Sequence, residues 1–115
     1  MRKIYSSNDV YDFVKPFELD KEKTERFICL YLKEDDSVIG MNDQTECDAM
    51  ISMCRIMGVH KVIFITNHPN GSSFPTSEDF NHTYQLKCLL KAVNVVIKDH
   101  IIVGHKEFFP TLMRM

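Results

Sequence analysis

The residues best suited to chemistry lie in one polar stretch, residues 65 to 79, which follows a short apolar run. His68 and Asp79 offer an imidazole nitrogen and a carboxylate oxygen, and zinc accepts both donor types. Thr76 lies three residues before Asp79 and adds a hydroxyl group. Because loops at strand ends often carry functional residues, the stretch predicts a candidate metal site that uses His68 and Asp79.

The same residues also fit a purely structural role. Thr76 and Asp79 have the spacing of a capping box, in which a hydroxyl residue and an acid three positions later start a helix. Residues 68 to 71, His-Pro-Asn-Gly, are typical of a turn. Residue chemistry alone therefore leaves both interpretations open, and the structural one is the commoner in proteins.

The order of these residues resembles the signature of RadC-like proteins in the JAB/MPN (JAMM) superfamily. That signature is His-x-His-Pro, a serine eight residues after the second histidine, and an aspartate three residues later. His68 matches the second histidine, Thr76 takes the serine position and Asp79 matches the aspartate. Thr66 stands where the first histidine belongs.

Other segments extend the resemblance to residues 6 to 109. Residues 6 to 16 resemble the helix that opens the domain, and residues 99 to 104 resemble a later Asp-His-Leu-Ile-Ile-Gly strand. Glu25-Arg26-Phe27 resembles the Glu-x-Phe start of the first long strand. One further departure is that the segment before the helix expected from Thr45 is shorter than in typical RadC-like domains.

The resemblance implies metal-assisted hydrolysis of an amide or isopeptide bond, with Zn²⁺ as the cofactor. Two histidines and the aspartate hold the metal in that family, and the fourth position takes water. By position, His68 and Asp79 would be metal ligands, Glu25 the general acid/base, and Thr76 the hydroxyl that helps to stabilise the oxyanion. Thr66 would occupy the missing third-ligand position, and a neutral hydroxyl is a far poorer zinc ligand than imidazole.

We therefore expect zinc to be weakly bound or absent, and the domain to be a weak or inactive enzyme that serves as a binding or assembly module for a protein or peptide. One alternative is an active zinc hydrolase with an unusual ligand set, in which His82 approaches the site from one turn beyond Asp79. A weaker alternative, which rests on the RadC family name, is a DNA-repair or mobile-element accessory protein.

Hydrophobic periodicity predicts an α/β protein of the layered α+β kind. The resemblance implies that its architecture is a JAB/MPN-like mixed sheet flanked by helices. The expected helices are residues 6–16, 45–57 and a third from Ser77. The expected strands are 27–32, a second from Val38, 62–65, 95–97, 101–103 and 107–109, with residues 66–75 as a polar loop. In the third helix we expect Leu86, Leu89, Leu90 and Val93 to face inward, and we expect His100 to bond backbone groups between strands.

Size and composition indicate one domain, residues 1–115, with 44% apolar residues. The net charge is −2, and no run of Lys or Arg exceeds two residues, which argues against direct nucleic-acid binding. No apolar run approaches the ~20 residues of a membrane span. Because the N-terminal residues also lack the apolar stretch of a signal peptide, we expect a cytoplasmic protein.

Overall fold

The structure is a computed structural model that describes residues 7–21, 23–43, 47–69, 76–104 and 107–110. Its helical elements, in chain order, are α1 (Ser7–Val14), the 3₁₀ turns η1 (Lys15–Phe17) and η2 (Leu19–Lys21), α2 (Cys47–Met57) and α3 (Ser77–Lys91). Its strands are β1 (Phe27–Leu32), β2 (Val38–Asp43), β3 (Lys61–Asn67), β4 (Val96–Gly104) and β5 (Glu107–Pro110). The layered α+β class predicted from the pattern is confirmed.

The five strands form one mixed sheet in the order β2-β1-β3-β4-β5. Strand β1 pairs antiparallel with both β2 and β3, whereas β3 and β4 run parallel and are joined by α3. Strand β5 closes the far side, antiparallel to β4. The parallel pair matters for the site because the end of β3 and the start of α3 must then lie at the same end of the sheet.

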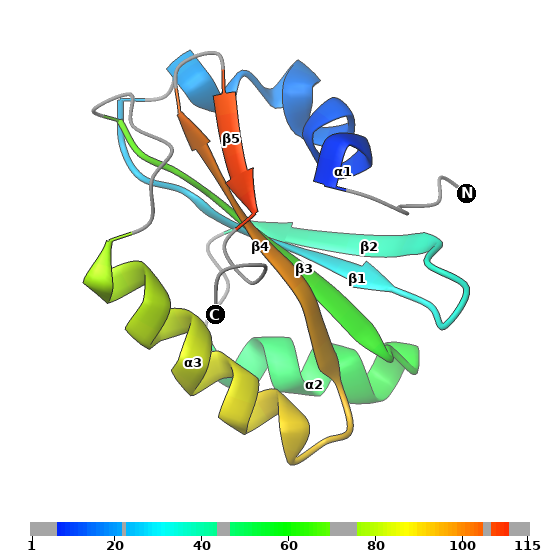
Figure 1. Cartoon of the computed structure of the whole chain (residues 1–115). Coiled ribbons are helices and arrows are strands. Elements are labelled where there is room, and N and C mark those ends of the chain that lie inside the picture. Colours follow the sequence, from blue (N-terminus) through cyan, green and yellow to red (C-terminus); the bar gives the residue numbers. More distant parts are fainter. Residues whose placement is uncertain (1–6, 22, 44–46, 70–75, 105–106, 111–115) are drawn as a thin grey trace.

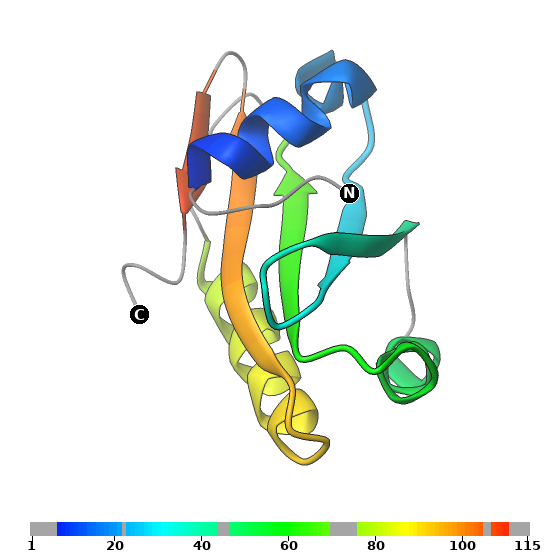
Figure 2. The same ribbon diagram turned by 90° about the vertical axis from the view of Figure 1, so that its right-hand side faces the viewer.

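Helices cover both faces of the sheet (Figures 1 and 2). Helix α1 and the two 3₁₀ turns pack on one face, and α2 and α3 pack on the other. Each face has its own hydrophobic core, as the alternation in β1 makes plain: Ile28, Leu30 and Leu32 face α1, and Cys29 and Tyr31 face the opposite way. The buried strand expected at residues 27–32 is thus buried on both sides.

Register places the start of β1 beside the end of β3. Phe27 lies opposite Thr66, so Glu25 precedes β1 at the same edge where β3 runs out and His68 follows. The backbone N–H of His68 still donates to the carbonyl of Val103 at 3.1 Å, which continues the β3–β4 pairing by one residue. Residues distant in sequence therefore meet at one end of the sheet.

Two expectations about β3 and β4 were wrong. Thr66 and Asn67 belong to β3 and not to the loop after it. Residues 96–104 form one strand and not two, because a bulge absorbs the polar residues in the middle: Ile97 pairs with Val62 and Asp99 pairs with Ile63, so Lys98 is left over. The released side chain of Lys98 reaches Asp36 at 2.8 Å.

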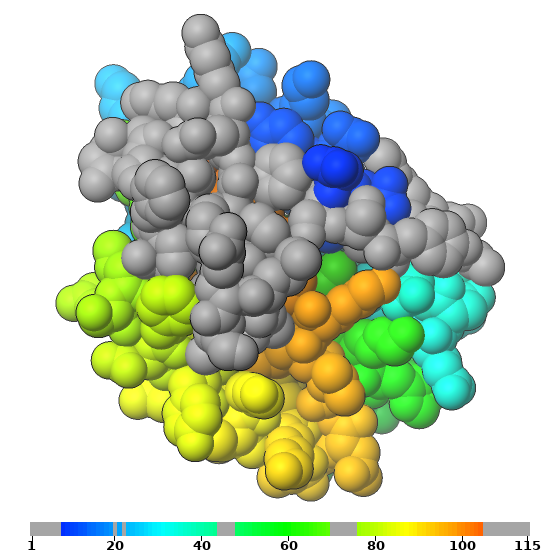
Figure 3. Space-filling view, viewed as in Figure 1, coloured from blue at the N-terminus to red at the C-terminus, as the bar shows by residue number. Residues whose placement is uncertain are grey.

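Helix α3 exposes more apolar surface than its pattern predicts. Leu86 and Leu90 are buried as expected, but Leu89 is 45% exposed and does not face inward. Tyr84 is also exposed. The outer surface of α3 runs along the lower edge of the molecule beside the first part of β4 (Figure 3). Of the described helices, none has the length and apolar character to cross a membrane.

Candidate metal and polar site

A pocket of about 560 Å³ opens at the end of the sheet where β3, α3 and the start of β1 meet. Glu25, His68, Thr76 and Asp79, four of the residues singled out from the sequence, line it. Pro69, Glu78 and His82 complete the described lining. Thr66 lies beside this group but is only 3% exposed, since it sits on the face of β3 covered by α3.

Thr76 and Asp79 form the capping box that starts α3. The Thr76 hydroxyl accepts the Asp79 N–H at 3.2 Å, and the Asp79 carboxylate accepts the Thr76 N–H at 2.7 Å. The Thr76 hydroxyl hydrogen is also directed at Asp79 Oδ2, at 3.0 Å. The structural role of this pair is therefore real, and it places the carboxylate in the pocket wall.

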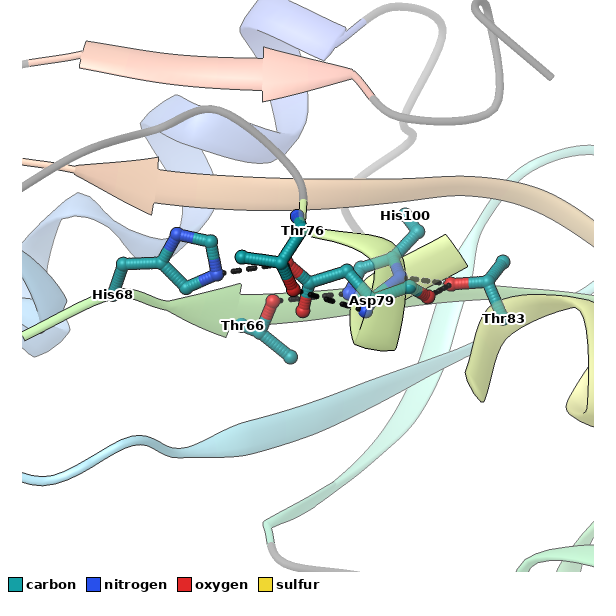
Figure 4. A network of polar contacts seen from close by, with 6 residues as sticks. All are labelled: Thr66, His68, Thr76, Asp79, Thr83 and His100. Carbon is teal, nitrogen blue, oxygen red and sulfur yellow. Dashed lines mark hydrogen bonds and ion pairs between the residues drawn. The ribbon is translucent and has the colours of Figure 1, made fainter. Parts of the chain in front are cut away.

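His68 meets the same carboxylate oxygen. Its Nε2 lies 2.9 Å from Asp79 Oδ2, within a hydrogen bond in which the imidazole N–H donates. His68 is 9% exposed, so this contact is shielded from water. Asp79 Oδ2 thus receives two donors from Thr76 and one from His68, and the two atoms expected to face a metal face each other (Figure 4).

The Thr66 hydroxyl bonds to a different residue, His100. The hydroxyl oxygen lies 3.0 Å from Nε2 of His100, a residue of β4 that is 1% exposed. The other ring nitrogen of His100, Nδ1, bonds to the hydroxyl of Thr83 in α3. The ring of His100 therefore bonds to two side chains, one on either side of it (Figure 4). The expectation that it would bond to backbone groups between strands was wrong.

The donor and acceptor of each hydrogen bond between Thr66, His100 and Thr83 can be assigned from one contact. The Thr83 hydroxyl donates to the carbonyl of Asp79 at 2.8 Å, so it can only accept from His100. His100 must then carry its proton on Nδ1, and Nε2 accepts the hydroxyl hydrogen of Thr66. Burial agrees with a neutral ring, since desolvation lowers the pKa of His100 to about 4. The nearby Asp79 carboxylate opposes that shift, while His82 and His68 add to it.

Aromatic rings pack against the two histidines near this group, His82 and His100. The ring of Phe27 lies 5.2 Å from that of His82, 6.2 Å from that of His100 and 5.0 Å from that of Phe64. His82 thus lines the pocket while it packs on Phe27. One alternative from the sequence was that His82 approaches the site as a further metal ligand. His82 does lie at the pocket, but its ring packs on Phe27 and is not grouped with His68 and Asp79 as a ligand.

The described donors do not fit a catalytic zinc site with three protein ligands. His68 and Asp79 supply two ligand atoms, and the hydroxyl at position 66 bonds His100. Within the described ranges, no three His, Cys, Asp or Glu side chains are grouped so that they could hold a metal.

Removing the Thr66 hydroxyl should destabilise the fold. Thr66→Val keeps the shape of the side chain but leaves His100 Nε2 buried without its donor, which costs about 1–3 kcal/mol of unfolding free energy. Thr66→Ser keeps a hydroxyl and is the matched control. Chemical denaturation at neutral pH measures both, and equal stability of the two variants would show that the bond to His100 is not made.

Sequence reasoning missed Thr83, Glu78 and the Thr66–His100 contact. Thr83 lies one turn after Asp79, so helical spacing could have predicted that both residues lie on the inner face of α3. The contact between Thr66 and His100 joins residues 34 positions apart in the sequence. No local pattern could have predicted it, because it depends on the parallel pairing of β3 with β4.

Comparison with known proteins agrees with this architecture. The model of the family described as "RadC-like JAB domain" matches residues 4–113. A UPF0758 protein of Methanosarcina mazei is 32% identical over 116 residues, which cover 93% of this chain and 50% of that protein. A UPF0758 protein of Carboxydothermus hydrogenoformans is 26% identical over 111 residues, 88% of this chain and 48% of that protein. The chain thus spans about half the length of these curated relatives.

Proposed function

The chain belongs to the family of RadC-like JAB domains, and on that premise we propose that it acts as a binding module for a protein or peptide segment, with an impaired zinc site. One observation carries the proposal: the side chain at the third-ligand position, Thr66, donates its hydroxyl to the buried His100. A hydroxyl engaged in this way is a poor substitute for a histidine ligand of zinc.

The contact between His68 and Asp79 supports the same conclusion. A metal would have to displace a shielded hydrogen bond between the two side chains and would gain only two protein ligands in return. Asp79 would in addition keep its bonds to Thr76, which hold the start of α3. The pair therefore stabilises the pocket wall without a metal.

The pocket itself supports a peptide segment as the occupant. Its volume of about 560 Å³ is in the range of sites that enclose small ligands or a few side chains. Glu25 and Glu78 add carboxylates to the wall, which disfavours the phosphate groups of nucleic acid. The DNA accessory role is accordingly not part of the proposal.

Titration with peptides tests the proposal. A pool of short unstructured peptides, added to isotope-labelled protein with zinc in the buffer, should shift the backbone amide signals of Glu25, Glu78 and His82. Mass spectrometry should recover the peptides intact. Glu25→Gln should weaken binding, whereas Glu34→Gln, the same exposed change beyond the opposite end of β1, should not.

The second candidate, a weak zinc hydrolase, gives a different result in the same experiment. It is favoured by the placement of Glu25, His68 and Asp79 around one pocket, where an acid/base and two ligands would be needed. Peptide cleavage that disappears in both Glu25→Gln and His68→Ala would support the hydrolase and contradict the binding module. Pocket signals that no peptide shifts would contradict both.

A further inference from the structure

Asn67 is a buried amide that the proposed function does not use. It is the last residue of β3, between Thr66 and His68, and it is 1% exposed. Side chains alternate along a strand, so Asn67 faces the side of the sheet covered by α1 and η2, opposite to Thr66. A polar side chain buried this deeply must find partners to offset its desolvation.

Its partners are three backbone groups in the segment that leads into β1. Asn67 Oδ1 accepts the backbone N–H of Arg26 at 2.6 Å. Asn67 Nδ2 donates to the carbonyl of Thr24 at 3.1 Å and to that of Leu19 at 3.3 Å. The set needs one acceptor and two donors, which a primary amide offers and which neither a hydroxyl nor a carboxylate offers.

These bonds bracket Glu25. The carbonyl before it and the N–H after it both bond to the same side chain, although Thr24 and Arg26 lie 43 and 41 residues away from Asn67 in the chain. Arg26 is held a second time through its guanidinium, which pairs with Asp43 of β2. Glu25 itself is exposed, so contacts of its neighbours must fix its backbone.

We propose that Asn67 is a positioning residue that fixes Glu25 relative to His68 across the pocket. His68 follows Asn67 directly in the chain, so one short piece of backbone sets both sides of the pocket. The inference rests on the proposed function only in so far as that function needs Glu25 to stand at this wall.

Nuclear magnetic resonance on the full chain tests the inference without any ligand. In Asn67→Ala the Arg26 amide should exchange with solvent about tenfold or more faster, measured against amides in the middle of β1. In the natural protein, Glu25→Gln should shift the ring signals of His68. In the Asn67→Ala background the same Glu25→Gln change should shift them by much less, which a role in stability alone would not produce.

Two further variants keep the test decisive. Asn67→Asp keeps the acceptor for Arg26 and removes both donors, so it should protect the Arg26 amide while reducing the response of His68 to Glu25→Gln. It also replaces the alanine variant if that variant fails to fold.

Asn42→Asp, which alters the amide that donates to the Tyr31 hydroxyl, is the matched control and should leave both readouts unchanged. Unchanged Arg26 exchange, or an undiminished His68 response, in Asn67→Ala would overturn the inference. Since no peptide is involved, failure of peptide binding and failure of this inference are distinguishable.

Discussion

Thr66→His should raise the affinity for zinc at least about 100-fold above that of the natural protein. Losing contacts around a metal's ligands already costs about 10–100-fold in affinity, and a restored ligand should gain at least as much. Residues 66 and 68 project from the same side of the strand, so the new imidazole would stand beside that of His68. Competition with a coloured chelator measures the affinity.

Two controls separate a restored site from a general effect of the substitution. Thr66→Asn has a side chain that approaches imidazole in shape but is a poor zinc ligand, and it should gain no affinity. Glu25→Gln in the Thr66→His background should leave zinc binding intact, because Glu25 is expected to carry a proton and not to bind the metal. Without metal, the variant should lose about 1–3 kcal/mol of stability, since an imidazole must fit where the hydroxyl now contacts His100.

If Thr66→His gains no zinc affinity, position 66 is not the only defect of the site. The end of β3 would then no longer direct this side chain toward His68 and Asp79. The binding-module proposal would survive that result, but its explanation through Thr66 would not.

The free energy of unfolding should fall in mild acid because of His100. Burial lowers the folded-state pKa of His100 to about 4, against about 6.5 in the unfolded chain, so the unfolded state binds the extra proton first. The stability that the neutral ring contributes is complete above pH ~6.5 and is lost as the pH falls toward 4. The loss should reach about 3 kcal/mol, measured by chemical denaturation over this range.

The slope with pH, and not the stability at one pH, identifies His100 as the cause. His100→Gln lowers stability at neutral pH because it disturbs the bonds to Thr66 and Thr83, but its stability should depend less steeply on pH between 6.5 and 4. His60→Gln, a change at an exposed histidine that is not among the groups that shift the pKa of His100, is the matched control and should keep the natural slope. A His100→Gln slope equal to the natural one would contradict the neutral, buried ring.

Much of the fold could be predicted because its elements carry local signals. The spacing of apolar residues predicted α2 and β3, and Gly58, with a positive φ of 65°, directly follows the end of α2. Strand β4 was divided wrongly because Lys98 and Asp99 look like a turn. Only the register against β3 shows that a bulge accommodates them.

The candidate site could be predicted only in its outline. The spacing of His68, Thr76 and Asp79 is local, and the structure brings these residues together with Glu25 at one pocket. The contacts that decide what the pocket can do are not local. Thr66 meets His100, and Asn67 meets the segment around Glu25, through strand pairing between distant parts of the chain, and composition and periodicity carry no trace of either.

The zinc content of the full chain, purified without chelator or added metal, is the measurement that decides whether the zinc site is impaired. Elemental analysis should be carried out on the natural protein and on His68→Ala side by side. We expect well below one equivalent of zinc in the natural protein and no difference between the two. One full equivalent in the natural protein that is lost in His68→Ala would contradict this expectation.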